Sequence, residues 1–159
     1  TVVIPAGTAV SVMQIDGAFE QEDCSSGLKI SVDFSGKNWS AGIIEAEGVF
    51  DLTLYRSFTF DVYLPDRAPR GLEVRVILVS GDDYRWIEMS QSILVQPGKK
   101  TRVKADLRQG RASWRCGTGE EIRMSDGIKE SVQKIGIRIE SDGIPYRGPV
   151  YIDNVRMEK

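Results

Sequence analysis

GPVYIDNVRM, residues 148–157, is the stretch from which the fold of this chain can be worked out. Val150 and Ile152 alternate with Tyr151 and Asp153, and this period of two is typical of a β-strand with one buried face. The alternation breaks after Asp153, as at a β-bulge. A carboxylate in an apolar run needs a partner, because burying an unpaired charge is costly. The stretch therefore predicts a final, bulged strand that holds a partnered acid.

Short alternating runs recur through the rest of the chain, with turn residues between them. The clearest strands are predicted at residues 8–15, 28–34, 58–64, 72–80, 84–90, 101–107 and 134–140, and a weaker one at 43–50. The runs at 72–80 and 84–90 are joined by Gly81-Asp82-Asp83 and predict a hairpin. One short helix is expected within residues 121–132, starting at Asp126. Nine or ten strands with almost no helix predict an antiparallel sandwich or barrel.

Composition narrows the possible functions. One domain, residues 1–159, is expected for a chain of this length, and it begins at Thr1 without a signal peptide, like an excised mature domain. A net charge of −2 gives no electrostatic reason to expect nucleic acid or a membrane surface as partner. No apolar run approaches the roughly 20 residues that span a bilayer. The absence of His removes the commonest general base and transition-metal ligand.

Two features remain open from the residues alone. The acidic run at residues 19–23 is either a solvated loop or a site for a hard cation such as calcium, which takes oxygen ligands. Cys24 and Cys116 fit no zinc or CxxC pattern, so they are either two free thiols or one disulfide. We hypothesise the disulfide, which would tie the acidic run to the loop that holds Trp114.

Six segments, in their order and spacing, resemble the jelly-roll carbohydrate-binding modules of bacterial glycoside hydrolases. These segments are GAFEQED (17–23), SGLKISVDFSGKNW (26–39), YRSFTFDVYLP (55–65), VQPGKKTRVKADL (95–107), VQKIGIRIESDG (132–143) and GPVYIDNVRM (148–157). The chain departs from the family pattern at Lys100, near a place where an aromatic residue is common. The resemblance covers most of the chain and implies an all-β, antiparallel β-sandwich of the jelly-roll type.

The resemblance also implies a structural calcium ion that joins the N-terminal segment to the final strand, away from the sugar. The matching ligands are Glu20, Glu22, the main-chain carbonyl of Lys29 and Asp153. Carboxylates with carbonyls suit calcium better than magnesium, which demands stricter octahedral geometry. The alternative is that Asp153 only caps a bulge by hydrogen bonding.

A sugar site needs flat aromatic surfaces for the C–H face of a pyranose and forked polar groups for its hydroxyls. The candidates are Trp86, Tyr84, Trp39, Trp114, Arg75, Glu88 and Arg138. Trp86 is expected on the opposite face of its strand from Ile87 and Met89, while Trp39 and Trp114 are expected in loops. Gly136 is expected to leave room for a sugar ring. The competing interpretation is that each Trp is core and that the charges are cross-strand pairs on a solvated face.

These observations favour noncatalytic binding of a β-linked polysaccharide by a monomeric, secreted module that targets an appended catalytic domain. β-Mannan is the first expected ligand, and β-glucan and xylan follow. One alternative is a structural or protein-interaction sandwich without sugar. A second is a glycan-cleaving enzyme, for which Glu73, Glu88 and Glu140 would be the candidate carboxylates.

Overall fold

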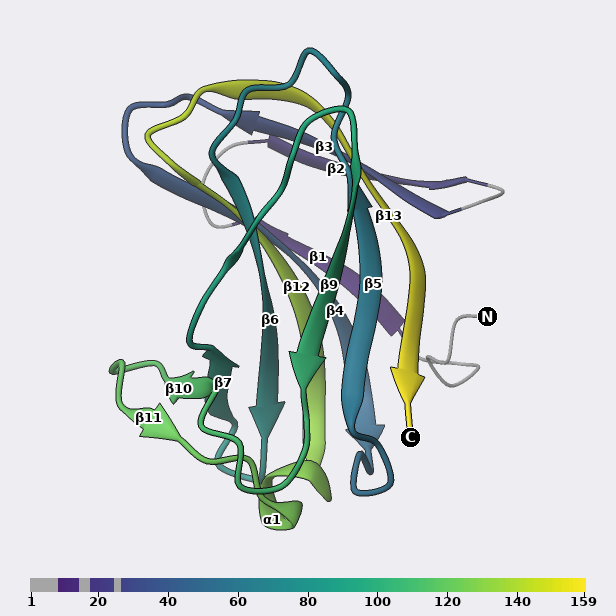
Figure 1. Ribbon diagram of the computed structural model, residues 1–159, viewed down its shortest axis with the longest axis vertical. Coiled ribbons are helices and arrows are strands. Elements are labelled where there is room, and N and C mark those ends of the chain that lie inside the picture. Colours follow the sequence, from purple (N-terminus) through teal and green to yellow (C-terminus); the bar gives the residue numbers. More distant parts are fainter. Residues whose placement is uncertain (1–8, 15–17, 25–26) are drawn as a thin grey trace.

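Two antiparallel β-sheets packed face to face make up the protein (Figure 1). The computed structural model describes residues 9–14, 18–24 and 27–159, with side chains from Leu28 onward. Within them there is one short helix, and no helix there is long and apolar enough to cross a membrane. The all-β, antiparallel sandwich predicted from the sequence is therefore confirmed.

The larger sheet has eight strands. Its order is β1-β4-β12-β6-β7-β10-β11, and β8 pairs with β6 beside this path. Its strands are β1 (Ala9–Gln14), β4 (Trp39–Phe50), β6 (Leu72–Ser80), β7 (Arg85–Met89), β8 (Ile93–Leu94), β10 (Trp114–Cys116), β11 (Glu121–Ile122) and β12 (Val132–Asp142). The two long strands β6 and β12 are neighbours near its middle, and β10 and β11 form one edge.

The smaller sheet has five strands in the order β2-β3-β13-β5-β9. Its strands are β2 (Ala18–Cys24), β3 (Gly27–Phe34), β5 (Ser57–Tyr63), β9 (Lys100–Asp106) and β13 (Tyr146–Glu158). In both sheets, strands that are distant in sequence lie side by side. The final strand β13 is central, between β3 and β5, so the stretch at residues 148–157 does hold this sheet together.

The core lies between the sheets and follows the period-two pattern. Alternate residues of β6 and β12 are buried in it, namely Leu72, Val74, Val76 and Leu78 on β6 and Ile137 and Ile139 on β12. Each of these side chains removes apolar area from water, which stabilises the fold by roughly 25 cal/mol per Å². The intervening residues of the same strands face away from the core. The sequence therefore predicted correctly which face of β6 and β12 is buried.

The helix α1 (Asp126–Lys129) begins where the sequence placed it. Ser125 caps its first turn, since the hydroxyl oxygen accepts a hydrogen bond from the main-chain N–H of Ile128 at 3.3 Å. The Lys129 ammonium donates to the carbonyls of Thr53 and Tyr55, at 3.1 and 3.0 Å. These bonds hold the helix against the loop between β4 and β5.

The bulge predicted in the final strand is present. Asn154 has a positive φ of 52°, and the register between β13 and β5 shifts between Asp153 and Arg156. Asn tolerates the left-handed backbone conformation better than most residues, because its short polar side chain can bond locally. Here its side-chain amide donates to Asp61 at 2.7 Å.

Three expectations about local structure were wrong. The acidic run at 19–23 is part of strand β2 rather than a loop, and residues 39–50 form one long strand, although only a weaker strand at 43–50 was predicted. Trp39 is the first residue of that strand, and Trp114 is the first residue of β10. In each case pairing with a neighbouring strand overrides a weak local pattern.

Candidate functional site

The outer face of the eight-stranded sheet, turned away from the core, carries most of the candidate residues. Arg75 of β6 and Arg138 of β12 are register partners and therefore sit side by side. Glu140 lies two residues further along β12, and Glu88 comes from β7, where the buried Ile87 and Met89 flank it. The hairpin of β6 and β7 is formed as predicted. The sheet thus gathers four charged side chains at one place.

These four side chains form an ionic network. Arg75 Nε donates to Glu140 Oε1 at 2.7 Å, and Arg138 Nη1 lies 2.9 Å from Glu88 Oε2. Arg138 Nη2 also reaches Glu140 Oε1 at 3.3 Å, and Arg75 Nη1 lies 3.5 Å from Glu88 Oε1. Like charges on directly opposite residues repel. The two carboxylates offset that repulsion and give the network no net charge.

The network is buried although it lies on an outer face. Its side chains are only 8–9% exposed, so each charge depends on its partners. Burial alone would raise the pKa of Glu88. Hydrogen bonds from Arg115 and Trp86, with the charges of Arg138 and Arg75, outweigh burial and hold the pKa of Glu88 below its usual value. Glu88 is therefore an anion at neutral pH.

Some nitrogen and oxygen atoms of the network make no hydrogen bond with the described residues. Arg75 Nη2 and Glu140 Oε2 make no hydrogen bond with the described residues. Arg138 Nε is fully buried and is the single such side-chain atom without a hydrogen-bond partner among the described residues. A donor and an acceptor with remaining hydrogen-bonding capacity can each bond a hydroxyl group, which both donates and accepts.

Two tryptophans border this network. Trp86 is half-buried, and its indole Nε1 donates to Glu88 Oε2 at 3.2 Å. Trp39 is 42% exposed, and the Arg138 guanidinium lies 5.6 Å from the centre of its ring. This distance allows a cation–π contact. Both indoles are therefore held in place by the charged groups between them.

Two of the predicted site positions, Trp114 and Gly136, do not have the open surroundings that we expected. Trp114 is completely buried in the core, where its Nε1 donates to the carbonyl of Asp106 at 2.7 Å, so it cannot contact a ligand. Gly136 leaves no room for a ring. A Cβ there would meet Ile43 at 3.3 Å and Ile77 at 3.5 Å, because these two side chains already close over the glycine.

Tyr84 lies at the turn that leads into β7 rather than over the network. It is 62% exposed and has a positive φ of 52°. Its place two residues before Trp86 keeps it near the border of the outer face. It is the most exposed of the candidate aromatic residues.

The sequence reasoning missed Arg115. Its guanidinium donates to Glu88 Oε1 from Nε at 2.8 Å and from Nη2 at 2.5 Å. Arg115 and Glu88 are register partners on β10 and β7. The signal was present, because a buried Trp114 puts the next residue on the outer face. Assigning Trp114 to a loop concealed it. Glu140 was recognised as outward-facing but was not chosen as a site residue.

The predicted calcium ligands lie on three neighbouring strands. Glu22 of β2 is the register partner of Lys29 on β3, which pairs in turn with Tyr151, two residues before Asp153. The side chains of Glu20 and Glu22 lie outside the described part of the chain. Asp153 accepts a hydrogen bond from the main-chain N–H of Asn154 at 2.7 Å, as the bulge-capping alternative requires, and lies 3.9 Å from Lys100 Nζ.

The described residues contain no group of three or more His, Cys, Asp or Glu that could hold a metal. Two of the four predicted ligands lack a described side chain. The main chain of Lys29 is in an inner strand, where its carbonyl also serves the sheet ladder. Calcium binding therefore stays a prediction.

The predicted disulfide is wrong. Cys116 is a free thiol, and its sulfur lies 2.8 Å from the Thr118 hydroxyl. Hydrogen bonds with Thr118 lower the pKa of this partly buried thiol. Cys116 ends β10 at one edge of the larger sheet, whereas Cys24 ends β2 at an edge of the smaller one, and these strands lie far apart in Figure 1. The side chain of Cys24 is outside the described residues.

Comparisons with known proteins support the fold. No protein-family model and no curated protein matches the chain. Solved structures of carbohydrate-binding modules do match it in fold. One is CBM27-1 of Caldicellulosiruptor saccharolyticus in complex with mannohexaose, with 19% identity and a TM-score of 0.55 over 91% of this chain and 83% of that one.

Two other modules are similar to the same extent. A non-crystalline-cellulose-specific module, CBM28, shares 16% identity at a TM-score of 0.57 over 91% of this chain and 83% of that one. A family 11 module from Clostridium thermocellum, in complex with a β-1,3-1,4-mixed-linked tetrasaccharide, shares 12% identity at a TM-score of 0.55, over 96% of this chain and 84% of that one. The neighbours of this fold thus include carbohydrate-binding modules that bind different glycans.

Proposed function

We propose that this chain binds a β-linked polysaccharide without cleaving it, on the outer face of the eight-stranded sheet. The observation that carries the proposal is the placement of Trp39 and Trp86 on either side of a buried ionic network. Structural neighbours that bind mannohexaose, non-crystalline cellulose and a β-1,3-1,4-mixed-linked tetrasaccharide support this class of ligand. β-Mannan is the first candidate, followed by β-glucan and xylan.

The chemistry of the face suits a sugar chain. An indole offers a flat surface against which the C–H face of a pyranose packs. Arg75 Nη2 and Glu140 Oε2 have unused hydrogen-bonding capacity for hydroxyl groups. Because both groups are fixed by ion pairs, little side-chain entropy is lost on binding, and this preorganisation favours affinity. Arg138 and Glu88 position the two indoles rather than contact the sugar.

We propose further that the module is monomeric and secreted, and that it is appended to a glycoside hydrolase. Binding would then keep the catalytic domain at high effective concentration near its substrate. A structural calcium ion held by Glu20, Glu22, the Lys29 carbonyl and Asp153 is part of the same proposal. The support for it is the register that puts β2, β3 and β13 side by side.

The enzyme alternative has a specific weakness. A glycosidase needs one carboxylic acid with a raised pKa, whereas the pKa of Glu88 is lowered by its partners. The protein-interaction alternative gains from the burial of Trp114 and loses from the exposure of Trp39. Incubating the pure domain with each polysaccharide and measuring reducing ends and unsaturated products separates cleavage from binding.

The central experiment is affinity electrophoresis through gels that contain glucomannan, mixed-linkage β-glucan or xylan, followed by calorimetry with the matching hexasaccharides. We expect retardation by at least one polysaccharide, and its loss in the Trp39→Ala/Trp86→Ala double variant. Leu54→Ala is the matched control, because Leu54 is an exposed apolar residue in the loop between β4 and β5. If the double variant is retarded as strongly as the control, the outer face is not the binding site.

A further inference from the structure

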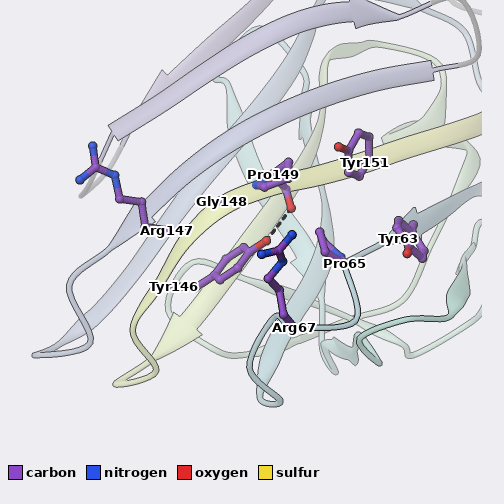
Figure 2. Close-up of a pocket in the computed structure, with 8 residues that line it drawn as sticks. All are labelled: Tyr63, Pro65, Arg67, Tyr146, Arg147, Gly148, Pro149 and Tyr151. Carbon is purple, nitrogen blue, oxygen red and sulfur yellow. Dashed lines mark hydrogen bonds between the residues drawn. The ribbon is translucent and has the colours of Figure 1, made fainter.

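A hollow lies on the smaller sheet, between the start of β13 and the loop that follows β5. Its volume is about 730 Å³, within the range of roughly 300–1,000 Å³ that is usual for small-ligand sites. The residues that line it and are drawn in Figure 2 include Tyr63, Pro65, Arg67, Tyr146, Pro149 and Tyr151. None of them belongs to the ionic network or to the two tryptophans of the outer face.

Proline explains why the hollow exists. The pairing between β13 and β5 ends at Tyr151 opposite Tyr63. Pro149 stands two residues before Tyr151 on β13, and Pro65 stands two residues after Tyr63 in the loop that follows β5. Neither has a main-chain N–H to donate to a ladder. The strands therefore separate at this point, and the loop after β5 forms the opposite wall.

Two tyrosines form an aromatic corner at one end of the hollow. The rings of Tyr63 and Tyr151 are 6.0 Å apart and inclined by 48°. Their strand neighbours Val62 and Ile152 are buried in the core, so both tyrosines face outward. Each tyrosine is partly exposed, which leaves an apolar surface that no described residue covers fully.

Tyr146 forms a fixed wall nearer the loop. Its hydroxyl donates to the carbonyl of Pro149 at 2.7 Å, and burial raises the pKa of this phenol. The ring lies over Gly148, where a Cβ would come within 2.8 Å of the tyrosine hydroxyl. Glycine at this position therefore lets the ring fold back along its own strand.

Arg67 gives the hollow a positive charge. It is exposed in the loop, and no described residue forms an ion pair or hydrogen bond with its guanidinium. Figure 2 shows this side chain rising from the loop toward the Tyr146 hydroxyl, whereas Arg147 points away from the hollow. Arg147 instead lies 3.6 Å from Asp33. The hollow thus holds one forked cation without a partner among the described residues, beside aromatic rings.

We propose that this hollow is a second carbohydrate site, specific for a sugar that carries a carboxylate, such as a uronic acid residue. The C–H face of the pyranose packs against Tyr151 or Tyr63, as aromatic rings allow. The Arg67 guanidinium binds the carboxylate through two parallel, charge-assisted hydrogen bonds, which are stronger than the bonds it makes to the hydroxyls of a neutral sugar. The site lies on the opposite sheet from the proposed polysaccharide face, so the two can be occupied independently.

The test uses methyl β-D-glucuronide as probe and methyl β-D-glucoside as its neutral match, each titrated into ¹⁵N-labelled protein and followed by NMR. We expect the glucuronide to shift the amides around Tyr63, Arg67 and Tyr151, with an effect that weakens as salt is added. Arg67→Gln should weaken its binding at least about tenfold, since hydrogen bonds to charged groups are the strong ones. Arg70→Gln, an exposed arginine of the same loop outside the lining, is the matched control.

Each contrary result overturns the proposal. Equal shifts with the glucoside, or unchanged binding in Arg67→Gln, would remove the role of the carboxylate. Shifts that map to Trp39 and Trp86, or no shifts with either probe, would remove the site itself. Polysaccharide retardation of Arg67→Gln tests the other face separately. Normal retardation with no glucuronide binding would sink this site and leave the proposed function intact.

Discussion

The indole of Trp86 and the carboxylate of Glu88 are joined by a hydrogen bond of 3.2 Å, from Nε1 to Oε2. The same oxygen lies 2.9 Å from Arg138, whose guanidinium reaches the ring of Trp39. One carboxylate therefore fixes both indoles of the proposed sugar face, one directly and one through an arginine. An account of glycan binding has to treat these residues as one unit.

Trp86→Ala should weaken polysaccharide binding at least about tenfold, because a stacking aromatic at a hot spot is commonly worth roughly 2 kcal/mol or more. Stability should change little, since a partly exposed side chain leaves no closed core cavity. Trp86→Phe keeps a ring but loses the hydrogen bond to Glu88, so its affinity should lie between that of the wild type and that of Trp86→Ala. Calorimetry and thermal melting on all three proteins check this. A phenylalanine variant weaker than the alanine variant would contradict the stacking role.

Trp114→Ala should destabilise the fold by about 3–5 kcal/mol, the usual cost of removing a buried aromatic side chain. Trp114 is wholly buried, and the carbonyl of Asp106 would lose its indole donor. Urea unfolding measures the effect, with Trp39→Ala as the control that changes an exposed tryptophan. Polysaccharide affinity per folded molecule should stay unchanged in Trp114→Ala. A large loss of affinity with normal stability would return Trp114 to the binding site.

Glu88→Gln should cost about 3 kcal/mol or more of stability, because it leaves three arginines around a neutral group in a buried network. It should also change the response to acid. The pKa of Glu88 is lowered below its ordinary value of 4.5. The ionised group therefore contributes stability that is fully present above about that pH and is lost as the pH falls through the folded-state pKa.

Stability measured from pH 7 downward checks this linkage. The wild type should lose stability below about pH 4.5, and the loss should be shallower in Glu88→Gln. Glu121→Gln is the matched control, since Glu121 is a well-exposed acid in β11. The pKa values of Asp61 and Asp106 are also lowered, and neither residue is changed in the two variants. Their contribution to the acid dependence of stability is therefore the same in all three proteins. Parallel acid curves for the wild type and Glu88→Gln would show that the network contributes nothing to acid stability.

Chelator should lower the melting temperature if calcium binds as proposed, because removing a ligand of the native state removes its linkage stabilisation. Asp153→Asn should have a lower melting temperature that no longer responds to chelator. Asp142→Asn, which changes an exposed acid at the end of β12, should respond like the wild type. If a sample shown to contain calcium melts at the same temperature with and without chelator, the ion is not structural.

The sequence by itself determined which residues of the long strands face outward. On β6 and β12 the alternation runs for several residues, and the period of two leaves no choice about the faces once one side is buried. The alternation alone therefore assigns Arg75, Arg138 and Glu140 to an outer face, and it does the same for Trp86 and Glu88 on β7. The bulge after Asp153 was visible for the same reason, as a break in an otherwise regular pattern.

Only the tertiary structure decided which of these groups meet. Glu88 joins Arg138 and Arg115 because β12 and β10 lie on either side of the β6–β7 hairpin, an order that no local pattern contains. Strand β10 has three residues, too few to show an alternation, so its buried Trp114 looked like a loop residue. The hollow beside Tyr63 and Tyr151 likewise arises where the pairing of β13 with β5 ends, next to Pro149 of β13 and Pro65 of the loop after β5. Local residue preferences act over a few positions along the chain, whereas these contacts depend on pairing between strands that are far apart in sequence.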